Sequence, residues 1–132
     1  MRLKAHKLIL LKQYSFEKLK FWDDIRLLVK QIYLLTKSFP EDERYGLISQ
    51  MRRSAISVSS NIAEGTSRTS LKYQAHFSQL SYSSLMELLS QSVLSFDLGF
   101  LKEHDYNELR LQIESLSRQI NALRKSQLER SK

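Results

Sequence analysis

The chain has 132 residues, a length that suits a single domain, because two separate cores of half that size would each be only marginally stable. It contains three Gly and one Pro, too few for a fold of many strands and tight turns, and its lack of Cys excludes disulfides, thiolate metal sites and a Cys nucleophile. The 21 Lys and Arg residues against 14 Asp and Glu give a net charge of +7, which favours polyanionic partners.

The beginning of the sequence predicts neither a targeting signal nor a membrane segment. Arg2, Lys4 and Lys7 precede an apolar run over residues 8–11, which is shorter than the core of a signal peptide. No stretch approaches the roughly 18 apolar residues that a transmembrane helix needs. We therefore expect a soluble protein without a membrane partner, and the absence of Cys favours the cytoplasm.

Residues 1–15 mix basic and apolar side chains without a clean period, so we expect a basic N-terminal extension followed by one domain over residues 16–128. The first predicted helix spans residues 17–38. Its apolar residues recur at steps of three and four, namely Leu19, Trp22, Ile25, Val29, Ile32 and Leu35. Pro40 stops this helix, because the residue before a proline is driven out of the helical region.

The second predicted helix spans residues 42–64. It begins where Pro40 and three acidic residues complement the positive end of a helix dipole. Its expected apolar side consists of Leu47 or Ile48, Met51, Ala55, Val58 and Ile62. Gly65 is expected to end the helix, since glycine is the common residue just past a helix C-terminus.

The third predicted helix, residues 70–98, is capped by Thr69 or Ser70 and closed by Gly99. Its expected face is broad and partly polar, with Tyr73, Phe77, Leu80, Ser84, Leu88, Gln91 and Ser95. Additional Leu and Phe residues beside this face indicate that one side meets another subunit, which predicts a homo-oligomer.

The fourth predicted helix spans residues 103–128. Its apolar residues alternate steps of four and three, as in a coiled-coil seam, and they are Leu109, Ile113, Leu116, Ile120 and Leu123. Because short connections join helices of similar length, neighbouring helices should be antiparallel. The sequence therefore predicts an all-α protein, an antiparallel up-down-up-down four-helix bundle.

No arrangement of residues predicts catalysis or a bound cofactor. His6, His76 and His104 are scattered, and none has the H-E-x-x-H spacing of a zinc enzyme, so we expect no metal. The nucleotide-binding glycine motifs and G-x-S-x-G are absent, and the many serines lack a paired base. We expect a protein that is not an enzyme and uses no cofactor.

The segment from Phe39 to Gly65 places unusual polar residues in an otherwise amphipathic helix. Arg53 and Glu64 are three helical turns apart and share a face, from which they could reach the third helix at Glu87. The favoured interpretation is an interhelical or intersubunit hydrogen-bond network of Glu43, Gln50, Arg52, Arg53, Asn61, Glu64 and Glu87. The alternative is that Arg52 and Arg53 bind phosphate, although the nearby acidic residues oppose it.

This segment reads F-P-x-x-E-x-Y-G-L-x-x-Q-x-R-R and then S-N-I-A-E-G. In this pattern the chain resembles the 23S rRNA intervening-sequence protein family over about residues 16–125. The resemblance implies an up-down-up-down bundle from bacteria, often assembled as a ring-like homopentamer and without a settled biochemical role. A distantly similar group, the accessory proteins of diversity-generating retroelements, binds nucleic acid and a reverse transcriptase. RNA binding by this chain is therefore expected by analogy only.

Nucleic-acid binding, with structured RNA such as rRNA as the ligand and DNA as another candidate, is the leading functional hypothesis. The expected phosphate contacts lie near both ends of the chain and are Lys4, Lys7, Lys12, Lys18, Lys20, Arg118, Arg124 and Lys125. The alternative is a structural or adaptor protein that assembles through its helices and binds a protein partner, with the basic ends serving solubility alone.

Overall fold

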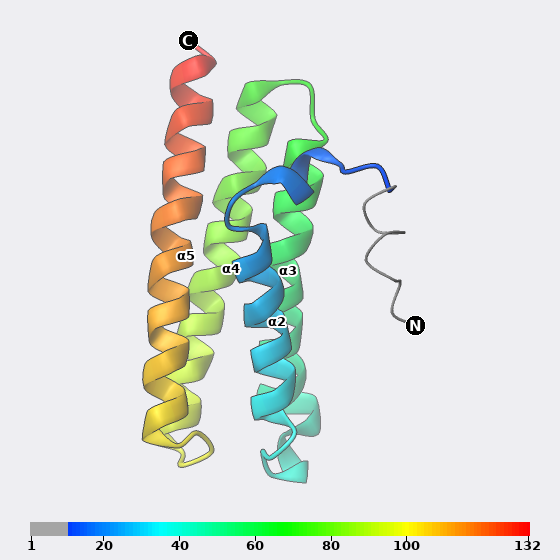
Figure 1. Ribbon diagram of the computed structural model, residues 1–132. Coiled ribbons are helices and arrows are strands. Elements are labelled where there is room, and N and C mark those ends of the chain that lie inside the picture. Colours follow the sequence, from blue (N-terminus) through cyan, green and yellow to red (C-terminus); the bar gives the residue numbers. More distant parts are fainter. Residues whose placement is uncertain (1–10) are drawn as a thin grey trace.

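The computed structural model describes residues 11–132, and in that range it consists of helices and their connections without a strand (Figure 1). The four long helices are α2 (Trp22–Thr36), α3 (Ser49–Thr66), α4 (Leu71–Asp97) and α5 (Glu103–Arg130). The prediction of an all-α four-helix fold is confirmed. In Figure 1 each helix after α2 starts at the end of the bundle where the preceding helix stops, so neighbours in the chain run in opposite directions. Within residues 11–132, none of these helices combines the length and apolar character that a membrane span requires.

The core lies along the axis of the bundle and is built from apolar side chains of all four helices. Its fully or almost fully buried members are Phe21, Ile25, Leu28, Ile32, Phe39, Met51, Ala55, Val58, Ile62, Leu85, Leu88, Leu101, Leu109, Ile113, Leu116 and Ile120. The apolar stripes predicted for the second and fourth helices supply half of this set. Helices α3, α4 and α5 pack most extensively, whereas α2 has fewer neighbours on α5.

The first helix is shorter than predicted. A 3-10 turn, η1 (Ser15–Lys18), precedes it, and the extended backbone of Leu19, with φ −68° and ψ 135°, separates that turn from α2. The rings of Phe16 and Trp22 nevertheless meet edge to face, with centroids 4.7 Å apart. The apolar period therefore continues through a break in the helix, because residues on both sides of the break pack against the same core.

The start of the second helix is also irregular. A 3-10 turn, η2 (Glu41–Glu43), leads into a π-helical segment, η3 (Arg44–Ile48), and α3 begins only at Ser49 rather than at residue 42. Gly46 within η3 has φ −108° and ψ −116°, which lie outside the helical region. This irregular backbone follows the acidic residues that had been expected to open a continuous α-helix.

The predicted core face of the third helix is wrong in part. Tyr73 and Leu80 are 64% and 37% exposed, whereas Ser81 and Ser92, which the predicted face did not include, are completely buried. The hydroxyl of Ser81 donates to the backbone oxygen of Val58 on α3 at 2.8 Å. Small side chains whose hydroxyls bond to backbone carbonyls let α4 approach α3 closely, and larger apolar residues of α4 consequently face outward.

The two glycines expected to end helices differ in their roles. Gly99 has φ +80° just beyond α4, which is the left-handed conformation expected of a terminating glycine. Gly65 instead lies inside α3, which continues to Thr66. A Cβ atom at Gly65 would lie 2.8 Å from the Cβ of Phe77, so its small size permits close packing of α3 against α4.

Candidate nucleic-acid interface

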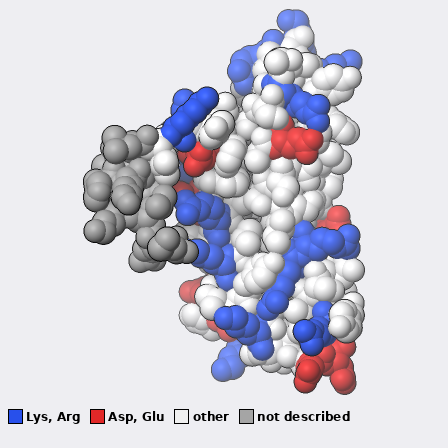
Figure 2. Space-filling model, turned by 90° about the vertical axis from the view of Figure 1, so that its right-hand side faces the viewer, with Lys and Arg blue, Asp and Glu red and all other residues white. Residues whose placement is uncertain are grey.

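The direction of the helices brings one group of basic residues together at the upper end of the bundle in Figure 1. The end of α3, the start of α4 and the end of α5 all lie there. The six basic residues of these segments, named here the basic end, are Arg68, Lys72, Arg124, Lys125, Arg130 and Lys132. Figure 2 shows Lys and Arg side chains gathered at this upper end on the face in view.

The opposite end of the bundle holds the connections that precede α3 and α5, which are rich in acidic residues. These residues are Glu41, Asp42, Glu43, Glu103 and Asp105. The excess of positive charge is therefore concentrated at one end of the folded molecule. The sequence-based expectation included Arg124 and Lys125 but missed Arg68 and Lys72, which lie in the middle of the chain beside acidic and neutral residues.

Within the basic end, the last turns of α5 form a shallow hollow. Its lining residues are Asn121, Arg124, Lys125, Leu128, Glu129, Ser131 and Lys132. Arg124 is half-buried and Lys125 is exposed. One structural role is evident as well, because Arg130 in the last turn of α5 complements the negative end of that helix dipole.

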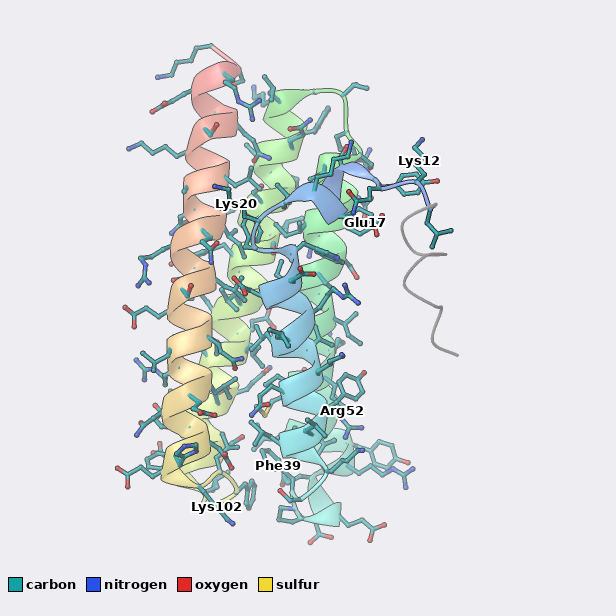
Figure 3. All side chains as sticks on the ribbon, viewed as in Figure 1. Lys12, Glu17, Lys20, Phe39, Arg52 and Lys102 are labelled. Carbon is teal, nitrogen blue, oxygen red and sulfur yellow. The ribbon has the colours of Figure 1, made fainter. Side chains whose placement is uncertain are left out.

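The other predicted phosphate contacts do not join this cluster. Lys4 and Lys7 lie outside the described residues. Lys12 sits over the ring of Tyr14, with its Nζ atom 4.9 Å from the ring centroid. Lys20 is exposed at the start of α2, and Figure 3 shows it well apart from Lys12.

The remaining predicted basic contacts are Lys18, on the η1 turn that packs beside the end of α3, and Arg118 on α5. Lys18 is exposed at the end of η1. Arg118 forms an exposed ion pair with Glu114, one turn earlier on α5, at 2.8 Å. Exposed pairs of this spacing stabilise a helix only slightly, but the carboxylate offsets the charge that Arg118 would offer to a phosphate.

The polar residues of the Phe39–Gly65 segment make separate contacts within one chain rather than one network. Arg53 donates to the side chain of Gln50 within the same helix. Glu64 forms an ion pair with Arg68 at 2.8 Å. Arg53 and Glu64 are both exposed, and they do not bond to each other. Within residues 11–132, Glu87 takes part in none of the side-chain hydrogen bonds or ion pairs, and the predicted link from Arg53 and Glu64 to α4 is not formed inside one chain.

Asn61 and Glu43 serve the backbone and the packing of helices. The Nδ2 of Asn61 donates to the backbone oxygen of Ser57 at 2.9 Å and lies 3.1 Å from its hydroxyl. That hydroxyl lies 2.8 Å from the hydroxyl of Ser84, which connects α3 to α4. Glu43 accepts a hydrogen bond from the backbone N–H of Leu47 at 3.1 Å and thereby supports the irregular entry to α3.

Arg52 connects α3 with the C-terminal turn of α2. Its guanidinium lies over the ring of Tyr33, 4.6 Å from the centroid. Its Nε donates to the hydroxyl of Thr36 at 3.0 Å and its Nη2 to the backbone oxygen of Tyr33 at 3.4 Å. The last carbonyls of a helix lack partners within the helix, so Arg52 acts in part as a cap on α2.

One cluster could hold a metal ion by its chemistry. His104, Asp105 and Glu108, at the start of α5, each bring one ligand atom to within 4.8 Å of the others. The sequence-based expectation considered zinc-enzyme spacing and overlooked the carboxylate of Glu108 four residues after His104. The two nitrogens of His104 face different carboxylates, each at 3.7 Å, and the acidic side chains complement the N-terminus of α5, so this geometry is explained without an ion.

The fold and surface define this protein as a four-helix bundle with a net positive charge, part of which gathers at the basic end. A comparison with protein families matches residues 17–122 to the family described as 23S rRNA-intervening sequence protein, and the chain belongs to that family. A search of curated proteins found no match.

Proposed function

We propose that this protein is a non-enzymatic, cytoplasmic bacterial protein that binds structured RNA, such as rRNA, as a homo-oligomer. The observation that carries this proposal is the basic end, where three helix termini place six cations together. The family's name refers to the intervening sequences of 23S rRNA, which makes rRNA the first RNA to test as a ligand. The absence of Cys fits a reducing compartment.

The charge balance of the basic end favours a polyanion. Two acidic residues, Glu64 and Glu129, lie on the same helix ends, so six cations against two carboxylates leave a net charge of +4 there. Glu64 pairs with Arg68 and offsets its charge, as Glu114 offsets that of Arg118. Cations that neutralise phosphates release condensed counterions, which supplies affinity that is largely independent of sequence. Tyr73, 64% exposed beside Lys72, adds an aromatic face on which an unpaired base could stack.

An exposed line of residues on α4 supports self-association. Leu80 and Leu94 are 37% and 51% exposed and lie two heptads apart, and the exposed Glu87 lies midway between them on the same line of the helix. The small residues Ser83 and Ser90 are exposed between them and would allow close approach of a second helix. We name this line the outer stripe of α4, and a homopentamer is the assembly that the family resemblance implies.

Fluorescence anisotropy with labelled rRNA fragments at two salt concentrations tests the RNA-binding proposal. The double variant Arg124→Glu/Lys125→Glu should weaken binding by at least about tenfold, because it replaces two phosphate contacts with repulsive charges. The matched control is Lys102→Glu/Arg110→Glu, which makes the same change of charge on exposed residues toward the opposite end of α5 (Figure 3). Circular dichroism checks that each variant remains folded. Absence of binding by the unaltered protein at low salt would refute the proposal.

An adaptor that binds a protein partner is the second candidate, and one observation favours it. Leu27 on α2 and Leu111 on α5 are 55% and 66% exposed at a hollow between these helices. The Oε1 atom of Gln112 in the same hollow is buried without a hydrogen-bond partner in the described part of the chain. If the protein captured a partner through Leu27 and Leu111 but bound no RNA at low salt, the adaptor function would replace the first proposal.

A further inference from the structure

A line of basic residues follows the seam between α2 and α3, apart from the basic end. On α2, Arg26, Lys30 and Lys37 are separated by four and seven residues, so they share one exposed face of the helix. Arg44 and Arg52 extend this line from the α3 side. We name these five residues the α2 basic track. None of the five was among the phosphate contacts expected from the basic ends of the sequence, although phosphate binding by Arg52 was the alternative interpretation of the Phe39–Gly65 segment.

Arg52 is held in place before any ligand arrives. The hydroxyl of Thr36 donates to the backbone oxygen of Ile32 at 2.7 Å, so its lone pair is free to accept from Arg52. A guanidinium has five N–H donors, and Arg52 uses two of them, on Thr36 and on Tyr33. Because the side chain is already ordered, contact with an anion through the remaining donors costs little further rotamer entropy.

The charges of the track are largely uncompensated. Within residues 11–132, ion pairs are formed by none of Lys30, Lys37, Arg44 and Arg52. Arg26 meets Asp23 only at 3.4 Å, and both side chains are mostly exposed. An exposed pair of this kind is weak and is readily exchanged for another anion.

The lower part of the track is hollowed. The hollow is lined by Thr36, Lys37, Phe39, Glu41, Arg44, Ile48 and Arg52, which together contribute three cations and one carboxylate. Figure 3 shows Arg52 between α2 and α3, above Phe39. The carbonyls at the C-terminus of α2 carry partial negative charge, which opposes a small free anion. A polyanion also contacts Arg26 and Lys30, and the attraction to these additional cations offsets the repulsion from the carbonyls.

We propose that the α2 basic track binds consecutive phosphates of one nucleic-acid strand, with Arg52 as its ordered contact. Eleven residues separate Arg26 from Lys37, or about 16 Å at 1.5 Å per residue. At roughly 3.4 Å per phosphate along a stacked strand, this length matches about five phosphates. The inference rests on the proposed RNA-binding function and adds a second contact surface to it, along the bundle rather than at its end.

The salt dependence of RNA affinity tests the track. The triple variant Lys30→Gln/Lys37→Gln/Arg44→Gln should lower the slope of log affinity against log salt by about two and weaken binding by at least about tenfold. The control is Lys102→Gln/Arg110→Gln, which removes exposed positive charges elsewhere, and the two variants are compared per charge removed. Light scattering and thermal melting show whether assembly and folding are unchanged.

The outcomes separate the two proposals. Failure of the unaltered protein to bind RNA at low salt refutes the proposed function and the track with it. If the unaltered protein binds RNA, but the triple variant matches the control in affinity and slope per charge removed, the track alone is refuted. Inorganic phosphate provides the other arm. If inorganic phosphate causes saturable NMR shifts at the Arg52 side chain and RNA does not compete with it, Arg52 belongs to a site for a free anion and not to a surface for a nucleic-acid strand.

Arg52 itself is tested by Arg52→Lys, which keeps the charge but loses the planar fork. A phosphate contact predicts that RNA shifts the Arg52 Nε resonance of the unaltered protein and that Arg52→Lys binds RNA several-fold more weakly. A purely capping role predicts a lower melting temperature with RNA affinity unchanged, and that result would remove Arg52 from the track.

Discussion

Individual small residues determine how closely α3 and α4 approach. Gly65 on α3 lies against Phe77, and Ser81 on α4 bonds to the backbone oxygen of Val58 on α3. A larger side chain at either position would have to displace backbone or the first atoms of a neighbouring side chain. Such atoms have little freedom to move in a close-packed interior. These small residues therefore set the distance between α3 and α4.

Replacing Gly65 with Ala should destabilise the protein by up to about 2 kcal/mol. The overpacking cost of about 1–3 kcal/mol from the 2.8 Å approach to Phe77 exceeds the gain in helix propensity of about 1 kcal/mol. Urea unfolding measures the difference. The control Ser60→Ala, on the exposed face of the same helix, should be neutral or slightly stabilising. A Gly65→Ala protein as stable as the unaltered one would show that α4 can shift away.

A buried polar pair between α4 and α5 gives a second prediction at this scale. The Ser78 hydroxyl donates to the Oε1 of Gln127 at 2.7 Å, and both residues are almost fully buried. Ser78→Ala should destabilise the protein by about 1–3 kcal/mol, because it leaves a buried acceptor unsatisfied. The double variant Ser78→Ala/Gln127→Leu should recover much of this loss. Additive effects in a double-mutant cycle of unfolding free energies would contradict the coupling.

At the scale of elements, the helices with simple apolar periodicity were the predictable ones. Leu109, Ile113, Leu116 and Ile120 on α5 are all buried, as their spacing predicts. The face of α4 was less predictable, because its buried side is rich in Ser and its hydroxyls bond to carbonyls that the sequence does not reveal. Periodicity identifies apolar side chains, whereas this interface depends on small ones.

The break before α2 shows another limit of periodicity. Phe16, Leu19 and Trp22 continue the expected steps of three and four, yet the backbone at Leu19 is extended. An apolar spacing that places side chains on one core can be satisfied by a turn and a helix as well as by a single helix. The position of such a break depends on tertiary contacts, here the meeting of the rings of Phe16 and Trp22.

Helix α2 should be the least protected element of the bundle. It has 15 residues, against 27 in α4 and 28 in α5, and it packs less extensively on α5 than its neighbours pack on one another. Elements with fewer packed neighbours open more often by local fluctuations. Hydrogen exchange followed by mass spectrometry should show α2 amides exchanging roughly tenfold faster than those in the middle of α4. Equal protection of the two helices would indicate that the bundle opens only as a whole.

At the scale of the whole molecule, the location of charge was only partly predictable. The sequence shows the basic residues near its end, including Arg124 and Lys125, but Arg68 and Lys72 become their neighbours only because α3, α4 and α5 alternate in direction (Figure 1). The polar pattern on α3 predicted one network, and within one chain the structure instead has separate bonds, of which those of Arg52 reach α2 and those through Ser57 reach α4. Arg53 and Glu87 remain exposed, where they are accessible to a second subunit.

The outer stripe of α4 gives the prediction for the assembled molecule. In the double variant Leu80→Glu/Leu94→Glu, charges replace exposed apolar side chains, so the free energy of unfolding of one subunit should change little while the oligomer dissociates. Light scattering measures the mass, and circular dichroism checks the helices. The matched control Leu27→Glu/Leu111→Glu alters exposed leucines on α2 and α5 and should leave the assembly intact. If the control dissociates the oligomer and the α4 variant does not, the subunit contact lies along the hollow between α2 and α5 instead.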